Sequence, residues 1–254
     1  MILRVLLTLV VVLYLEPQNT SNANLLFSDE FSEDSLDLNK WSYELGDGCP
    51  NLCGWGNNER QVYVKKNVST VNNQLVISAT KQGDTYYSGR ITSKDKFEFK
   101  YGTVEVKAQL PKGKGLWPAI WMLGHDIDTS TWPACGEIDI MEYVGKNPGE
   151  IHTTLHTPDS FGKSVNTKIT NIETIEDGFH VYKTKWDAKQ IQFYIDDALV
   201  YTFSPEIKND NTWPFNKPFY LILNLAIGGS FGGPEVDDSI FPEKFSIDYV
   251  RVYQ

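Results

Sequence analysis

The chain is 254 residues long, carries a formal net charge of −10 at pH 7 and contains 41% hydrophobic residues. A chain of this size can bury a large core, and single all-β sandwiches often reach this length. Its 23 lysines and arginines are scattered rather than gathered in a stripe, which argues against nucleic acid as a partner, and the negative charge disfavours anionic polymers in general.

Residues 1–23 have the pattern of a secretory signal peptide. Arg4 stands before an apolar run over residues 6–15, which is too short to span a bilayer comfortably. Polar residues 16–22 follow, and a small-x-small sequence ends the segment as expected at a cleavage site. An uncleaved membrane anchor is the alternative. We therefore predict one mature domain, residues 24–254, that is secreted, either outside the cell or into a bacterial periplasm, without a membrane segment.

The rest of the chain alternates apolar and polar residues in short segments between glycines and prolines. This pattern predicts β-strands, and no stretch of ten or more residues shows a helical stripe. Asp196 and Asp197, between two such segments, indicate a β-hairpin. Many short strands without a repeat or linker predict a single all-β sandwich or barrel. The expected strands cover residues 75–79, 96–99, 104–108, 191–195, 199–203, 219–227 and 245–252.

Three carboxylates stand close together in an otherwise apolar segment, at Glu137, Asp139 and Glu142. On a regular strand Glu137 and Asp139 share a face, whereas Glu142, five positions after Glu137, points the other way. A β-bulge at Ile140 or Met141 would restore the parity and turn all three to one side. Two such carboxylates, one a nucleophile and one a proton donor, are what glycoside hydrolysis needs. A metal site or an acidic, solvated strand face is the alternative.

The segment 136–142 resembles the Glu-x-Asp-x-x-Glu signature of glycoside hydrolase family 16, in the laminarinase-like branch, which carries the bulge residue. The likeness extends over residues 27–253. It implies an all-β fold, a bent β-jelly-roll sandwich of two antiparallel sheets with a concave substrate cleft. It also implies the catalytic roles, with Glu137 as nucleophile, Glu142 as acid/base, and Asp139 as the residue that holds and tunes the nucleophile.

Three tryptophans are candidates for sugar stacking. Trp117 and Trp121 are an even distance apart, so both can face one side of a strand, and Trp132 comes shortly before the carboxylates. Indole rings are amphipathic and suit the flat apolar faces of sugars, although tryptophan is also a common core residue. The resemblance favours the cleft for Trp117 and Trp121, since laminarinase-like sequences carry a similar Leu-Trp-Pro-Ala-x-Trp stretch.

Polar residues supply further candidates for substrate binding. Asn58, in a loop rich in Gly and Asn, can bind sugar hydroxyls or serve as a turn residue. The resemblance places Arg90 in the cleft, where a solvated surface charge is the alternative, and His156 near the acid/base. Asn224 interrupts an apolar strand and either braces the core or reaches the cleft. Phe231 stands where the family often has a tryptophan, so the sequence does not decide whether this position contacts the substrate in the cleft.

The three cysteines have separate expected roles. Cys49 and Cys53 flank three residues of a Gly-rich loop and can pair if the loop folds back in an oxidising compartment. Cys135 is expected to be a buried, inert thiol because no electropositive partner is indicated nearby. Asn67 begins an Asn-x-Ser pattern for N-glycosylation, which matters in a eukaryotic secretory pathway.

The resemblance also implies a structural calcium ion on the convex face. Its ligands would be the carboxylate of Asp248 and the backbone carbonyls of Glu30 and Asn73, a set of oxygens of the kind calcium prefers. The chemistry of hydrolysis itself needs no cofactor.

We expect a secreted, monomeric endo-glycosidase that cleaves a neutral β-1,3-glucan with retention. Mixed-linkage β-1,3-1,4-glucan is the alternative substrate, and agar-type galactans are less favoured. A transglycosylase would use the same residues and differ only in whether water or sugar intercepts the intermediate. A β-glucan-recognition lectin on the same fold is the alternative from another class, but such a protein would lack the catalytic glutamates, and both are present here.

Overall fold

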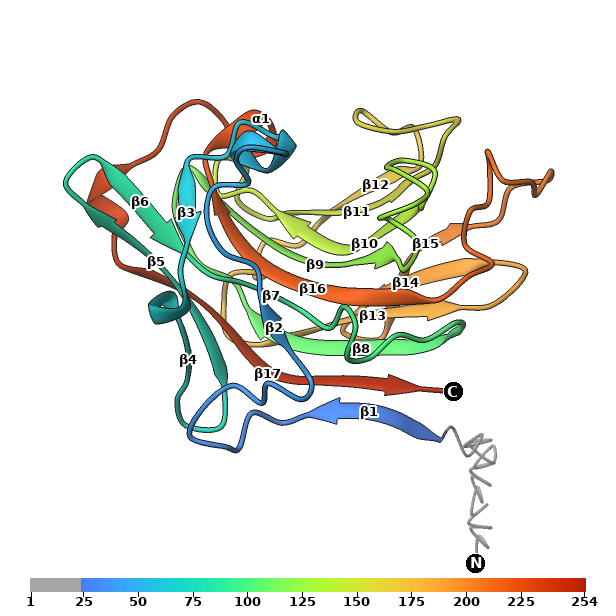
Figure 1. Ribbon diagram of the computed structural model, residues 1–254, viewed down its shortest axis with the longest axis horizontal. Helices are drawn as coiled ribbons and strands as arrows, with labels where there is room; N and C mark the ends of the chain where they lie inside the picture. The colour runs from blue at the N-terminus through green and yellow to red at the C-terminus, as the bar shows by residue number, and fades with distance from the viewer. Residues whose placement is uncertain (1–23) are drawn as a thin grey trace, which may run out of the picture.

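The computed structural model describes residues 24–254, so the predicted signal peptide lies outside the described part of the chain. Two stacked β-sheets make up nearly all of the regular structure in this range (Figure 1), and its α-helix, α1 (Gly229–Gly232), has four residues. No helix within residues 24–254 is long and apolar enough to cross a membrane. The predicted all-β sandwich is confirmed.

The larger sheet has ten strands and forms the lower layer in Figure 1. It contains both described chain ends, because the first strand pairs with the last. In sheet order its strands are β15 (Ala198–Phe203), β14 (Ile191–Ile195), β13 (His180–Trp186), β8 (Gly102–Gln109), β17 (Glu243–Tyr253), β5 (Leu75–Gln82), β6 (Thr85–Ser88) and β3 (Gln61–Tyr63), with β1 (Leu25–Asp29) paired to β17 and β4 (Val68–Thr70) paired to β5.

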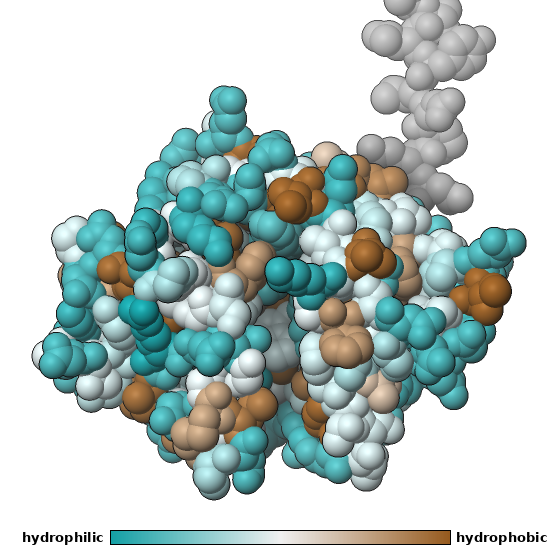
Figure 2. All heavy atoms as spheres, turned by 90° about the horizontal axis from the view of Figure 1, so that it is seen from above, coloured by the Kyte–Doolittle hydropathy of each residue, from teal (hydrophilic) through white to brown (hydrophobic). Residues whose placement is uncertain are grey.

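The smaller sheet has seven strands and curves so that its open side faces away from the larger sheet (Figure 1). Figure 2 looks onto this side and shows the surface hollowed near its centre, between two raised parts of the molecule. The concave cleft therefore lies over this sheet. In sheet order its strands are β12 (Thr167–Asn171), β11 (Glu150–His156), β10 (Glu137–Tyr143), β9 (Leu116–Gly124), β16 (Phe219–Ile227), β7 (Arg90–Thr92) and β2 (Ser42–Tyr43).

One large apolar core fills the space between the sheets. Strand β8 follows the expected two-residue period, since Val104, Val106 and Ala108 are buried and the residues between them are half-buried. Strand β16 is instead buried at every position. One face of β16 packs in the core, and on the other face Asn224 is covered by Trp121, a side chain of the cleft.

The prediction of a strand at residues 96–99 is wrong. The hydroxyl of Ser93 donates a hydrogen bond to the carbonyl oxygen of Phe97 at 2.8 Å and closes a turn, so that Phe99 makes just an isolated bridge to Phe219. The rings of Phe97 and Phe99 stack with centroids 5.6 Å apart. The alternation in this segment therefore reflects two rings packed side by side on a turn.

The expectation of wholly antiparallel sheets also needs one correction, because β3 pairs with β6 in parallel. The hairpin predicted at Asp196 and Asp197 is present between β14 and β15. Both residues have positive φ, +47° and +66°, as a two-residue hairpin turn of this kind requires.

Asn67 does not offer a glycosylation site in the folded chain. The residue is 4% exposed, and its side-chain nitrogen donates hydrogen bonds to the carbonyl oxygen of Ser78 at 2.6 Å and to Thr80 Oγ1 at 3.0 Å. The same nitrogen also donates to the carbonyl oxygen of Tyr87 at 3.3 Å, and a glycan on it would replace one of its two hydrogens in a site that is closed to solvent.

Candidate active site

The three carboxylates project from one face of β10 because this strand contains a β-bulge. Between Asp139 and Glu142 the register of β10 advances one residue more than that of its partner β11. The extra residue falls at Ile140 and Met141, both of which are buried in the core. The predicted bulge is confirmed, and it leaves Glu137, Asp139 and Glu142 on the side away from the core, as the parity argument requires.

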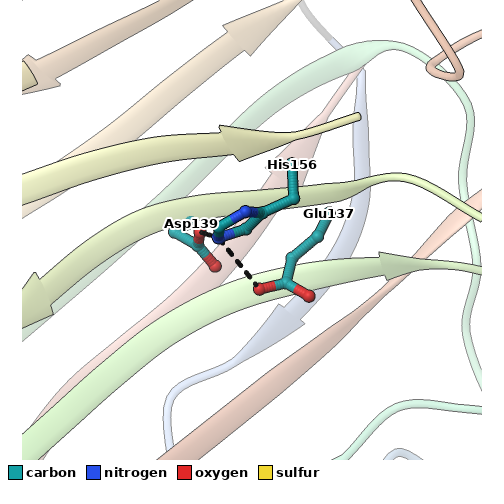
Figure 3. A group of neighbouring side chains, drawn as sticks. All are labelled: Glu137, Asp139 and His156. Atoms are coloured by element: carbon teal, nitrogen blue, oxygen red, sulfur yellow. Dashed lines mark ion pairs between the residues drawn. The ribbon is translucent and has the colours of Figure 1, made fainter. Parts of the chain in front are cut away.

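Glu137 and Asp139 share a histidine neighbour from the adjacent strand (Figure 3). His156 lies directly opposite Glu137 in the β10–β11 ladder. Its Nε2 is 3.3 Å from Asp139 Oδ2 and 3.7 Å from Glu137 Oε1. The other oxygen of Glu137, Oε2, accepts a hydrogen bond from Trp132 Nε1 at 2.8 Å. His156 therefore lies beside the expected nucleophile, and its charge also acts on the expected acid/base, Glu142.

Glu142 has a different partner. The indole Nε1 of Trp117 donates a hydrogen bond to Glu142 Oε1 at 3.0 Å. Trp117 is 9% exposed, so it presents little ring surface for stacking and acts here as a donor to the carboxylate. Trp132, by contrast, is 41% exposed and packs edge-on against the exposed ring of Phe161, with centroids 5.4 Å apart. Trp132 and Phe161 are therefore the exposed aromatic pair beside the carboxylates, and sequence reasoning missed Phe161.

Burial raises the pKa of all three carboxyl groups. Burial, and next the charge of Asp139, raise the pKa of Glu137 to about 8, while His156 opposes the shift. Burial raises the pKa of Asp139 to about 7. Burial, with the charges of Asp139 and Glu137, also raises the pKa of Glu142 well above its usual range. Three negative charges do not coexist here at neutral pH, so the cluster keeps a proton for acid/base chemistry.

Arg90 is held between two aromatic rings rather than solvated. Its guanidinium carbon lies 4.4 Å from the ring centroid of Trp55 and 5.0 Å from that of Trp121. Its Nε donates a hydrogen bond to Glu44, and the side chain is 11% exposed. Strand β7 thus places a buried arginine beside Trp121 of β9. In the sheet, β9, β16 and β7 all lie on the same side of the catalytic strand β10.

Asn224 braces Trp121. Its Oδ1 accepts a hydrogen bond from Trp121 Nε1 at 2.8 Å, and its Nδ2 donates to the hydroxyl of Tyr63 at 3.1 Å. That hydroxyl in turn donates to Glu59 Oε2 at 3.2 Å. The sequence left open whether Asn224 braces neighbouring side chains or reaches into the cleft, and these contacts support a bracing role. Sequence reasoning missed Tyr63 and Glu59, although Glu59 closes the Trp-Gly-Asn-Asn-Glu stretch that drew attention to Asn58.

Asn58 has the geometry of a turn residue. Its φ is +56°, a left-handed conformation that asparagine tolerates. Its Nδ2 donates a hydrogen bond to Ser230 Oγ at 3.0 Å, which ties this loop to α1. Phe231, which follows Ser230 in the chain, packs edge-on against Trp117 with ring centroids 5.3 Å apart. A contact between Asn58 and substrate stays a prediction.

The sequence of the chain is similar to those of known proteins. Residues 56–251 match the family model described as Glycosyl hydrolases family 16. The chain belongs to glycosyl hydrolase family 16. It is 39% identical, over 91% of its length and 85% of the other protein, to a Beta-glucanase of Rhodothermus marinus.

Solved structures of laminarinases have the same fold as this family 16 chain. The laminarinase from Flavobacterium sp. UMI-01 is 56% identical, with a TM-score of 0.89, and the match covers 91% of this chain and 100% of that one. The laminarinase catalytic domain from Thermotoga maritima MSB8 is 38% identical, with a TM-score of 0.86, and the match covers 91% and 98% of the two chains. The bent β-jelly-roll expected from the resemblance is confirmed.

The calcium ligands expected in this family 16 chain come from neighbouring segments of the larger sheet. Asn73 precedes β5, which pairs with β17, the strand of Asp248. However, Asp248 Oδ2 forms an ion pair with Lys107 Nζ at 2.8 Å, and both carboxylate oxygens of Glu30 accept hydrogen bonds from Arg251. These side-chain contacts do not involve the backbone carbonyls of Glu30 and Asn73, which make up the rest of the expected ligand set. The calcium site stays an expectation from the resemblance.

The cysteines behave as expected. Cys49 and Cys53 form a disulfide. Cys135 is fully buried beside Leu123 and Tyr220, and burial raises the pKa of its thiol to about 12. A thiol held in its protonated form is not a nucleophile, so Cys135 has a packing role despite its closeness to Glu137 in sequence.

Proposed function

We propose that the chain is a retaining endo-β-1,3-glucanase of the laminarinase type, with Glu137 as the nucleophile and Glu142 as the acid/base. The observation that carries this proposal is the bulged strand β10, which aligns both glutamates and Asp139 on the cleft side of the smaller sheet. Two similar proteins, a Beta-glucanase and a laminarinase, bear names that agree with a β-glucan as substrate.

In the first step Glu137 attacks the anomeric carbon while the bond to the leaving sugar oxygen breaks. The N–H of Trp132 binds one oxygen of Glu137 and so orients the carboxylate for attack. Glu142, kept protonated by burial and by its acidic neighbours, gives its proton to the leaving oxygen. The products of this step are the released sugar chain and a glycosyl ester on Glu137.

In the second step Glu142, now ionised, takes a proton from water, and the water oxygen attacks the anomeric carbon and releases Glu137. The N–H of Trp117 stabilises the negative charge that Glu142 carries between the two steps. Net retention of configuration follows from the two displacements.

Asp139 and His156 are assigned to control of the nucleophile's charge. Asp139 is 3% exposed and lies within reach of both Glu137 and His156. A proton held between these groups moves toward Asp139 when Glu137 must be ionised, and His156 supplies the compensating dipole or charge. Both residues are therefore positioning residues rather than groups that bond to the sugar.

The stack of Arg90 between Trp55 and Trp121, with Asn224 fixing the indole, is assigned to binding of the glucan chain beside the catalytic strand. Amphipathic rings beside fixed polar groups suit a neutral sugar chain. We further propose that the mature chain is secreted and acts as a monomer.

The deciding experiment measures reducing-sugar release from laminarin, mixed-linkage glucan and agarose by the purified mature chain, with product length followed by chromatography. Falling chain length on laminarin supports endo-β-1,3-glucanase action, and proton NMR of the first products must show the β-anomer. Transfer to added oligosaccharide in place of hydrolysis would replace the proposal with a transglycosylase. Binding of laminarin without release would replace it with the lectin.

A further inference from the structure

Glu137, Asp139 and His156 are arranged like ligands of a transition-metal ion. One carboxylate oxygen from each acid and one ring nitrogen all lie within 4.8 Å of one another. A tetrahedral zinc site with bonds of 2.0–2.1 Å places its ligand atoms about 3.3 Å apart. The observed separations from His156 Nε2, 3.3 Å to Asp139 and 3.7 Å to Glu137, are close to that value.

The ring nitrogen of His156 faces one oxygen of Asp139 and one oxygen of Glu137 (Figure 3). Glu137 Oε2 accepts a hydrogen bond from Trp132, so Oε1 is the oxygen that faces His156. Asp139 is 3% exposed, and its Oδ2 forms no hydrogen bond among the described residues, its polar neighbour being His156 Nε2 at 3.3 Å. A buried carboxylate oxygen without a hydrogen bond is costly, and a cation bound to it and to His156 would satisfy it.

The charge around this point is negative. The third acid of the cluster, Glu142, comes from the same strand, β10. The group that opposes this negative charge at Glu137 and Glu142 is His156 of the neighbouring strand β11, rather than a lysine or arginine. Like charges that repel one another in the free protein would be neutralised by a divalent ion. The imidazole nitrogen selects Zn²⁺, Co²⁺ or Cu²⁺ over Mg²⁺ and Ca²⁺, which prefer all-oxygen sites.

We propose that Glu137, Asp139 and His156 bind a divalent transition-metal ion such as Zn²⁺. The ion inhibits the enzyme because it coordinates Glu137 Oε1, the oxygen that attacks the sugar.

We expect this metal to bind reversibly and not to be a permanent part of the enzyme. A metal-bound histidine normally donates its second ring N–H to a fixed partner, and His156 Nδ1 is buried without one. Lack of such a partner typically weakens binding about 10–100-fold, so the ion binds reversibly.

Binding is measured directly, by calorimetry with Zn²⁺ and by the visible absorption that Co²⁺ shows in a four-coordinate site. This measurement does not depend on turnover, whereas the inhibition does rest on the proposed function. We expect one Zn²⁺ per chain, with affinity lowered 10-fold or more in His156→Gln. His152→Gln is the matched control, because His152 is a buried histidine on the same strand that lies outside the cluster.

Thermal unfolding of each variant checks its fold, and Zn²⁺ added to the wild type should raise the unfolding temperature where Mg²⁺ does not. Competitive inhibition of laminarin hydrolysis by Zn²⁺, relieved by a chelator, is the expected kinetic result. Equal Zn²⁺ affinity in wild type and His156→Gln would overturn the proposal, as would absence of binding at millimolar Zn²⁺. Binding without inhibition would keep the site and refute its effect on Glu137.

Discussion

The hydrogen bond from Trp117 to Glu142 makes a quantitative prediction about the pH profile. Trp117→Phe removes the donor but keeps an aromatic ring that can pack edge-on against Phe231. The bond favours the ionised form of Glu142, so its loss raises the pKa of that group further. A hydrogen bond to a charged group contributes about 1.5–3 kcal/mol, and about 1.4 kcal/mol corresponds to one pKa unit. The basic limb of kcat/KM should therefore move up by about one to two pH units.

The assay is laminarin hydrolysis across the pH range, with kcat and KM separated. Because Glu142 is ionised in the intermediate, kcat at neutral pH should also fall, by a factor of about 10–100 on the same energy scale. Trp121→Phe is the matched control. It removes an indole N–H that is bonded to neutral Asn224, so it should raise KM without moving the basic limb. A basic limb that stays in place in Trp117→Phe, or moves to lower pH, would refute the assignment of Glu142 as the acid.

Three further predictions concern the nucleophile and the bracing amide. Glu137→Gln should lower the turnover of laminarin by more than about 10⁴-fold, while laminarin binding measured by calorimetry persists. Asp139→Asn should lower turnover by a smaller factor, and equal losses in the two variants would contradict the supporting role of Asp139. The folded-state pKa of Glu137, about 8, lies above the unfolded value of 4.5, so its contribution to stability is complete below pH 4.5 and is lost as pH rises toward 8. The unfolding temperature of Glu137→Gln should accordingly fall less over that window than that of the wild type, and parallel curves would speak against the raised pKa. Asn224→Leu leaves the indole N–H of Trp121 unpaired and should reduce the free energy of unfolding by about 1–3 kcal/mol in urea.

The sequence by itself determined the features that depend on local period. Alternation along the strands predicted the all-β fold, and the odd spacing from Glu137 to Glu142 predicted the bulge at Ile140 or Met141. Both follow from the two-residue repeat of a strand, which acts between near neighbours in the chain. The same rule failed at residues 96–99, where a hydrogen bond from Ser93 to Phe97 closes a turn that alternation does not reveal.

Only the tertiary structure decided which side chains meet. His156 lies beside Glu137 because the β10–β11 register pairs those two residues. Arg90 lies near Trp121 because β7 and β9 flank β16, and the loop that carries Trp55 covers the arginine from the other side. These contacts join residues that are distant in the chain, so no local pattern encodes them. They depend on strand order and register, which are set by packing of the whole core between the two sheets.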